Sequence, residues 1–359
     1  MRTILFLVPD LQCYGYAKQA TLLATTLPRE QFVVHVGVLG KDGIFSKRLR
    51  QTGIPVHSVG ASRSWLQGAL GLRRLLRELS PDAVQAWGGA VPWAACARSV
   101  RLDRCPWKLI AVDPHPRIWL RAAAKVVAHF SHDAERIHYP HTRVISLAVE
   151  EHAPTLERAA FLQSCGLPGA ARFVLCAGVM VKRHGFREAV WIFDILKYIY
   201  PNLWLLIAGD GPERRVVEAF SRSRGPRDNR VKFLGNRDDV PQFVGLAELA
   251  WICGRRGGHN FALEALAAGC PVVAPRLPEF VELLGNNEAG ILVASETASD
   301  FAQASRRILD DPVLRSTLAR FGRTWATRFG PTRIVKQWLE LYADLFSPAG
   351  CNSSPHLSP

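Results

Sequence analysis

The chain has 359 residues, 48% of them hydrophobic and 21% charged, which excludes a disordered chain and fits two α/β domains of about 150 to 200 residues each. Its formal net charge of +14 predicts a negatively charged partner, and charge alone does not choose among phosphorylated substrates, anionic lipid and nucleic acid. The basic residues form no recognisable nucleic-acid-binding module, so we expect no nucleic-acid partner.

The N-terminal residues 4–8 form an apolar run that ends at Pro9 without a small-residue cleavage site, which favours a buried strand over a secretion signal. No stretch approaches the roughly 20 apolar residues of a membrane-spanning helix. The eight cysteines contain no Cys-x-x-Cys pair, which favours reduced thiols. We therefore expect a cytoplasmic protein, whose basic surface is either simply solvated or in peripheral contact with the anionic inner face of the membrane.

In the first 150 residues, short apolar runs alternate with longer amphipathic stretches, which is typical of a parallel sheet wound with helices. Helical spacing of Leu and Ala predicts helices at residues 18–27, 45–52 and 65–79. Strands are expected at residues 3–8, 33–39, 56–59, 83–86, 109–112, 125–128 and 144–146. Residues 1–150 are therefore predicted to form an N-terminal Rossmann-like domain.

The pattern pauses over residues 150–171, where a linker and a short helix are expected, and then restarts. Strands are predicted at 172–176, 203–208, 231–234, 249–253, 271–274 and 290–293, and helices at 186–199, 212–224, 238–247, 260–268, 278–284 and 298–309. Residues 151–330 thus form a predicted C-terminal Rossmann-like domain. The fold class is α/β, with two facing Rossmann-like domains and an interdomain cleft.

The last helical pattern runs over residues 315–346 and contains Phe329-Gly330-Pro331, which should break it. The part after the break, residues 331–347, is predicted to pack back towards the N-terminal domain. Residues 348–359 are predicted to be a disordered tail.

Two glycine-containing motifs place sharp turns at the ends of predicted strands. They are Ala208-Gly-Asp-Gly-Pro212 and the run from Gly257 to Ala274, which passes from loop through helix into strand. Ligands of open α/β sheets bind outside the carboxyl ends of the strands, where a helix start offers unpaired N–H groups to phosphate. The helix that begins near Asn260 is such a site, and Glu264, one turn into it, can reach the ribose of a nucleotide. Taken singly, the glycines could equally be plain turns.

Taken together and in order, the motifs resemble the GT-B glycosyltransferases and, within them, the retaining group 1 family of bacterial sugar transferases. The segments that carry the resemblance are Gly15-Tyr-Ala-Lys-Gln19, Ser80-Pro-Asp-Ala-Val84, Gly178 with Gly185-Phe186, Ile207-Ala-Gly-Asp-Gly-Pro212, Val231-Lys-Phe-Leu-Gly235, Asp239-Val-Pro241 and Leu263 to Ala274. The resemblance implies hexosyl transfer, with retention, from a UDP- or GDP-linked sugar to a glycan or lipid-linked acceptor. It also implies that residues 1–150 are the acceptor-side domain and residues 151–330 the nucleotide-sugar domain. The nucleotide-sugar is then a co-substrate, and no cofactor or metal is required.

Three charged donor contacts of that family are altered in this chain. The family has two glutamates eight positions apart; the second is Glu264, but the first position holds Arg256. An arginine and a lysine that hold the diphosphate are replaced by Val179 and His184. Each lost contact costs about 2 to 4 kcal/mol of transition-state stabilisation. We hypothesise that Lys182, Arg183 and Arg256 take over the neutralisation of the diphosphate; a decayed site with a basic surface loop is the alternative.

The resemblance also implies which residues form the site. The predicted catalytic residues are His115, on a loop that should face the cleft, and Arg256. The two prolines beside His115 make a purely structural loop equally consistent with the sequence. The predicted donor-binding residues are Gly15, Lys182, Arg183, His184, Gly257, Gly258, His259, Asn260, Phe261 and Glu264.

Two alternatives to glycosyl transfer share this fold. The altered residues Val179, His184 and Arg256 would also suit a catalytically inactive GT-B protein that binds glycan or supports an active partner. A sugar-nucleotide epimerase on the same fold would need acidic and histidine groups on both sides of the sugar carbon, and no such set is evident. The histidine pairs His129/His132 and His138/His141 lack the cysteine or carboxylates that would complete a metal site.

Overall fold

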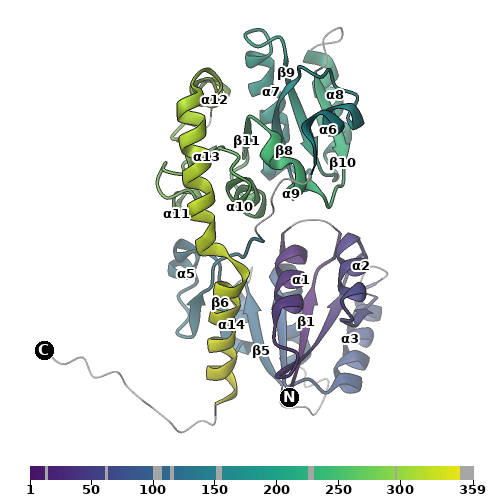
Figure 1. Cartoon of the computed structure of the whole chain (residues 1–359). Helices are drawn as coiled ribbons and strands as arrows, with labels where there is room; N and C mark the ends of the chain where they lie inside the picture. The colour runs from purple at the N-terminus through teal and green to yellow at the C-terminus, as the bar shows by residue number, and fades with distance from the viewer. Residues whose placement is uncertain are drawn as a thin grey trace, which may run out of the picture.

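The computed structural model describes residues 1–12, 15–60, 64–99, 107–113, 117–150, 156–224, 230–295 and 297–347. Both the predicted tail, residues 348–359, and His115 lie outside the described residues. Two parallel sheets with helices on their faces lie in separate halves of the molecule, one above the other in Figure 1. We call the half built on strands β1 to β7 the first domain and the half built on β8 to β13 the second domain.

The first domain contains a seven-stranded sheet in the order β3-β2-β1-β4-β5-β6-β7. Its strands are β1 (Arg2–Val8), β2 (Phe32–Val38), β3 (Val56–Ser58), β4 (Ala83–Trp87), β5 (Lys108–Val112), β6 (Lys125–Ala128) and β7 (Thr142–Val144), and all are paired in parallel. The helices are α1 (Tyr16–Thr26), α2 (Ile44–Gln51), α3 (Trp65–Leu79), α4 (Val91–Ser99) and α5 (Ser131–Ile137). One apolar core joins α1 and α2 to the sheet, and another joins α3 and α4 to the opposite face. Nearly continuous apolar strands such as β1 are expected where both faces of a sheet are covered.

The second domain contains a six-stranded parallel sheet in the order β10-β9-β8-β11-β12-β13. Its strands are β8 (Arg172–Ala177), β9 (Leu203–Ala208), β10 (Val231–Gly235), β11 (Leu249–Trp251), β12 (Val272–Pro275) and β13 (Gly290–Val293). Its helices are α6 (Arg158–Ser164), α7 (Phe186–Leu196), α8 (Arg214–Arg224), α9 (Val240–Phe243), α10 (His259–Ala267), α11 (Pro278–Leu283), α12 (Ala298–Asp310) and α13 (Pro312–Ala326). Again the sheet is covered on both faces, with α7, α8 and α12 on one side.

The C-terminal helix returns from the second domain to the first. α13 ends in a short 3-10 turn, and α14 (Pro331–Phe346) begins at Pro331, whose missing N–H is not needed at a helix start. Ile334, Trp338 and Tyr342 of α14 are buried in the core that contains α1. The Tyr342 hydroxyl donates to Oε1 of Gln85 on β4 at 2.6 Å. Figure 1 shows α14, in yellow, alongside the lower half of the molecule.

The α/β fold class predicted from the sequence is confirmed, and each expected strand is present within about two residues of its predicted bounds. Two helices, α4 and α5, were not predicted. Residues 91–99 are apolar at almost every position and residues 131–137 at only two, so neither run shows the spacing of an amphipathic helix. The single helix expected over 238–247 is instead α9 followed by a 3-10 turn, Val244–Leu246.

The strand orders indicate where a ligand can bind at the edge of each sheet. The chain winds outward from β1 in one direction and from β4 in the other, and it does the same from β8 and β11 in the second domain. Ligands of such sheets bind outside the carboxyl ends of the strands at this reversal. The helices that follow these strands, α1 after β1 and α10 after β11, therefore begin at the two candidate sites.

Candidate functional site

The start of α10 is shaped by two consecutive glycines in the left-handed region. Gly257 has φ 86° and Gly258, which caps the helix, has φ 84°. A side chain would be strained at either position, and a Cβ on Gly258 would lie 2.8 Å from Cγ2 of Ile252. The glycines thus turn the chain from the carboxyl end of β11 into α10, whose first-turn N–H groups have no intrahelical partner. Such a start can bind phosphate.

The start of α1 in the first domain contacts this start of α10. Lys18 Nζ donates to Oε1 of Glu264, and Nε2 of Gln19 donates to Oδ1 of Asn260 at 2.5 Å. Asn260 in turn donates through Nδ2 to the Gly15 carbonyl at 3.3 Å. These bonds join residues far apart in the chain, so the carboxyl edges of the two sheets meet at this point.

Gln19 is fixed from behind by the backbone of the first domain. Its Nε2 donates to the Ala148 carbonyl, and its Oε1 accepts from the Ala148 N–H, each at 2.8 Å. The Ala148 backbone therefore fixes the orientation in which the Gln19 side chain bonds to Asn260. The contact between α1 and α10 is a bonded junction that includes the segment leading from β7 towards the second domain.

The carboxylate of Glu264 is buried, and its two oxygens differ. The side chain is 1% exposed, and Lys18, which pairs with Oε1, is 10% exposed in its side chain. Oε2 is buried and has no hydrogen-bond partner among the described residues. An unsatisfied buried acceptor costs free energy that a ligand donor can recover.

His184, in the loop after β8, packs against Gly257 in the loop before α10. Its Nδ1 donates to the Val179 carbonyl at 2.7 Å, and a Cβ on Gly257 would lie 2.3 Å from its Nε2. Burial is the largest effect on the pKa of His184 and lowers it. The charges of Arg183 and His259 lower this pKa further, whereas the hydrogen bond to the Val179 carbonyl raises it. The ring is therefore neutral near pH 7 and contributes packing rather than charge to the site.

Three cations predicted to lie near the diphosphate are exposed at this edge. Lys182 and Arg183 belong to a 3-10 turn, Lys182–His184, and Arg256 lies two residues before the capping glycine. Burial and the charge of Asp113 raise the pKa of the Tyr16 phenol in the first domain. The positive charge of Arg183, in the second domain, opposes that rise. All three side chains are exposed to solvent at this edge.

His259 and Phe261, also predicted to bind donor, have other contacts here. The ring of His259 lies 4.7 Å from that of Phe130 in the first domain, and its Nε2 is 3.9 Å from Oε1 of Glu279. Burial would raise the pKa of Glu279, but His259 and other neighbouring donors lower it overall. Phe261 is buried in the apolar core, so only its backbone N–H is available at the helix start.

The first domain contributes a histidine that sequence analysis missed as a site residue. His129 follows β6, donates through Nδ1 to the Ile145 carbonyl at 2.8 Å, and has no hydrogen-bond partner on its buried Nε2. That Nε2 is 3.7 Å from Oδ2 of Asp113, whose φ of 45° places it in the left-handed region. The position of both residues directly after predicted strands was the signal that could have identified them.

Lys18 and Gln19 were also missed, although they belong to the Gly15-Tyr-Ala-Lys-Gln19 motif. Only the glycine of that motif was assigned to donor binding. The signal was their place in the first turn of a helix that follows a strand, which puts polar side chains at the carboxyl edge.

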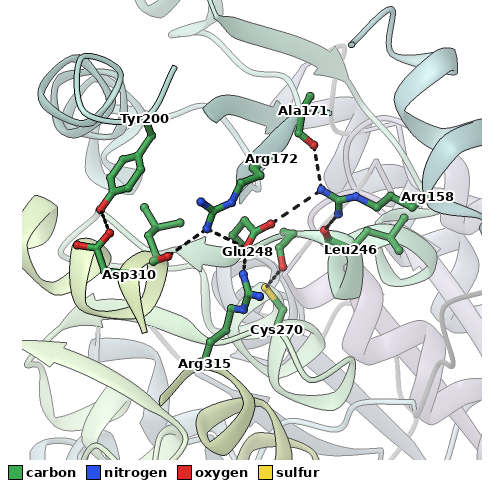
Figure 2. Close-up of polar contacts among 11 residues, drawn as sticks. Arg158, Ala171, Arg172, Tyr200, Leu246, Glu248, Cys270, Asp310 and Arg315 are labelled. Carbon is green, nitrogen blue, oxygen red and sulfur yellow. Dashed lines mark hydrogen bonds and ion pairs between the residues drawn. The ribbon is translucent and has the colours of Figure 1, made fainter. Parts of the chain in front are cut away.

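A second buried carboxylate lies at the opposite, amino edge of the second sheet (Figure 2). Glu248 directly precedes β11, and three arginines from α6, β8 and α13 converge on it: Arg158 at 3.9 Å, Arg172 at 3.3 Å, and Arg315 in direct contact. Arg158 also donates to the carbonyls of Leu246 and Ala171. This cluster ties three elements together and is structural.

Within the described residues, no group of three or more His, Cys, Asp or Glu side chains could hold a metal ion. No described helix combines the length and the apolar character needed to cross a membrane.

The chain is similar in sequence to known proteins. Residues 157–325 match the family "Glycosyl transferases group 1". The chain is 28% identical to the lipopolysaccharide core biosynthesis glycosyltransferase LpsD of Rhizobium meliloti (strain 1021), over 76% of this chain and 78% of LpsD. It is 32% identical to LpsE of the same organism, over 49% of this chain and 51% of LpsE.

Solved structures show the same fold. The structure of Anabaena HepE in complex with UDP and glucose superposes with a TM-score of 0.81 at 21% identity, covering 96% of this chain and all of HepE. WaaG, a glycosyltransferase involved in lipopolysaccharide biosynthesis, superposes with a TM-score of 0.73 at 18% identity, covering 94% of this chain and 99% of WaaG. The fold is therefore GT-B.

Proposed function

We propose that this chain, whose residues 157–325 match the group 1 glycosyl transferases, moves a hexosyl group from a nucleoside diphosphate sugar to a glycan or lipid-linked acceptor. The observation that carries the proposal is the meeting of the two carboxyl edges at the starts of α1 and α10. A donor bound there would present its sugar to the first domain. The anomeric configuration of the donor would be retained in the product.

The diphosphate would lie on the start of α10. The N–H groups after Gly257 and Gly258 supply hydrogen bonds and the positive end of the helix dipole. His184 brings no charge, so Lys182 and Arg183 would neutralise the departing phosphates, and Arg256 would extend the cationic surface. Charge that develops on a leaving diphosphate is stabilised best by cations and dipoles already in place.

The nucleoside would be recognised through Glu264. Its unpartnered Oε2 is a suitable acceptor for a ribose hydroxyl. A UDP- or GDP-linked sugar meets the requirement, and UDP is favoured because the HepE structures contain UDP, UDP with glucose, or UDP-glucose. The nucleotide-sugar would be consumed as a co-substrate.

The acceptor would bind on the first domain. In front-face transfer the departing phosphate oxygen takes the proton of the acceptor hydroxyl, so the protein need not supply a strong base. Asp113 and His129 lie where an acceptor would enter, at the carboxyl ends of β5 and β6. A catalytic role for His115, which follows Asp113 in the chain, remains part of the proposal. The names of LpsD and LpsE support a lipopolysaccharide-type acceptor.

Titration calorimetry with UDP, GDP and UMP tests the donor site. We expect a nucleoside diphosphate to bind with a dissociation constant between about 1 µM and 1 mM and the monophosphate to bind more weakly, because the second phosphate reaches the start of α10. The anomeric configuration of the product, read by NMR, tests retention. If neither UDP nor GDP binds at millimolar concentration, the proposal fails.

The neutral, inward-facing His184 favours one alternative, a non-catalytic GT-B protein. The triple variant Val179→Arg, His184→Lys and Arg256→Glu restores the charges of the family at these positions. If only the triple variant hydrolyses UDP-sugars, the natural site is inactive. If the natural chain transfers sugar and the variant is slower, Lys182 and Arg183 have replaced the missing cations.

A further inference from the structure

Two helices from different domains share one buried carboxylate. Lys18, in the first turn of α1, is the only described residue that hydrogen-bonds to the side chain of Glu264, which lies on α10. The pair is largely excluded from water, with Lys18 8% exposed and Glu264 2% exposed as whole residues. A buried pair of this kind restricts how the carboxylate can turn, since losing the contact would leave a charge unpaired.

The bonding of Glu264 is one-sided. Lys18 binds Oε1, and Oε2 is buried without a donor among the described residues. By contrast, both polar ends of the neighbouring Gln19 side chain are bonded, to Asn260 and to the Ala148 backbone. Where α1 meets α10, the Gln19 amide is therefore bonded through both its nitrogen and its oxygen, whereas one oxygen of the Glu264 carboxylate is not bonded to any described residue.

We propose that Lys18 is a positioning residue for donor recognition: it holds Oε1 of Glu264 so that Oε2 is presented to the ribose hydroxyls of the nucleotide. This inference rests on the proposed function and extends it. The first domain, to which the acceptor is assigned, then also takes part in recognising the donor. Ribose recognition becomes complete only when α1 lies against α10.

The proposal separates Lys18 from a residue that only joins the domains. A purely structural Lys18 would affect every nucleotide equally, because its loss would loosen the junction without regard to the sugar. A positioning Lys18 would affect the ribose hydroxyls selectively. The ratio of dissociation constants for UDP and its 2′,3′-dideoxy analogue measures that selectivity.

The experiment compares this ratio in the full-length wild-type protein and in Lys18→Met. A hydrogen bond to a charged group contributes about 1.5 to 3 kcal/mol, so the wild type should prefer UDP about tenfold or more. In Lys18→Met the ratio should fall towards one. If Lys18→Met is too unstable to measure, Lys18→Gln, whose amide is uncharged and one bond shorter than the lysine side chain, should also lower the ratio.

Two matched controls should leave the ratio unchanged. Gln19→Met weakens the same junction without touching Glu264, so both nucleotides should bind more weakly by the same factor. Lys47→Met removes an exposed lysine from α2 and should change neither affinity.

The outcomes identify which statement fails. If the wild type binds neither UDP nor GDP, the proposed function fails and this inference with it. If the wild type binds UDP and its dideoxy analogue equally, ribose recognition by Glu264 fails while the nucleotide site stands. If the wild type discriminates and Lys18→Met or Lys18→Gln discriminates equally well, only the role of Lys18 is overturned.

Discussion

The second domain buries two glutamates at opposite edges of one sheet, and their surroundings differ. Glu248, at the amino edge, is within ion-pair distance of three arginines, all from the same domain. Glu264, at the carboxyl edge, has one lysine, which comes from the other domain, and an oxygen without a partner. Burial alone therefore does not separate a structural carboxylate from a functional one.

What separates them is whether the hydrogen-bonding capacity of the carboxylate is used within the domain. Two of the arginines around Glu248, Arg158 and Arg172, also donate to the backbone carbonyls of Ala171, Leu246 and Leu309. The bonds of this cluster therefore stay within the second domain (Figure 2). The repulsion within the cluster is real: burial chiefly, and then the neighbouring arginines, lower the pKa of Arg158 and Arg315. Removing the shared anion should therefore be costly for the fold.

The largest expected effect is that of Glu248→Gln on stability. It would leave three guanidinium groups around a neutral amide, and breaking a buried pair costs about 3 to 5 kcal/mol. Because these arginines are about a third exposed, we expect a loss of about 2 to 3 kcal/mol in the free energy of unfolding. Urea denaturation measures it.

Two measurements complete this test. The exposed Glu340→Gln on α14 is a matched control and should stay within about 0.5 kcal/mol of wild type. The affinity of folded Glu248→Gln for UDP should equal that of wild type, because the cluster lies at the far edge. A stable Glu248→Gln would mean that solvent screens the charges of the arginines well enough without the carboxylate.

The next largest effect is that of Glu264→Gln on ligand binding. Its amide can still accept from Lys18, but an ionised acceptor for the ribose is lost, so UDP affinity should fall about tenfold. The loss of stability should be smaller than that of Glu248→Gln, because the charge of one lysine, rather than the charges of three arginines, loses its counter-ion. Calorimetry and urea denaturation on the same samples measure both. A large loss of stability with unchanged UDP affinity would mean that Glu264, like Glu248, stabilises the fold and does not bind the nucleotide.

The sequence was sufficient to predict the sheets and the position of Glu264, because apolar runs and glycine turns are local signals. It did not predict the partner of Glu264. Lys18 and Glu264 are 246 positions apart, and only the packing of two domains brings them together. In the same way, the altered His184 was read as a lost charge, whereas its burial against Gly257 depends on the folded loop.

The third prediction concerns the glycines that form the Glu264 edge. Gly257→Ala adds a Cβ at φ 86° and 2.3 Å from Nε2 of His184, so it should cost about 1 to 2 kcal/mol of stability and weaken UDP binding. Gly60→Ala is the matched control, since Gly60 has φ 79° and nothing within 4 Å of the added Cβ. It should lose stability through strain alone and bind UDP normally. Equal UDP affinities in the two variants would exclude a role for the Gly257 turn in the site.

The smallest expected effect is the contribution of His184 to the pH dependence of stability. Its pKa is lowered in the folded chain, chiefly by burial, so below its ordinary value of about 6.5 the unfolded chain binds a proton that the folded chain does not. The free energy of unfolding should therefore fall as pH is lowered from about 7.5 to about 5.5, and the fall should be shallower in His184→Asn. Asn is a suitable replacement because its amide can still donate to the Val179 carbonyl. His35, whose pKa is lowered by burial and by His57, titrates in both proteins and cancels in the difference. If the two slopes are equal, His184 is not held neutral by the fold, and a cationic His184 would have to be counted with Lys182 and Arg183 beside the diphosphate.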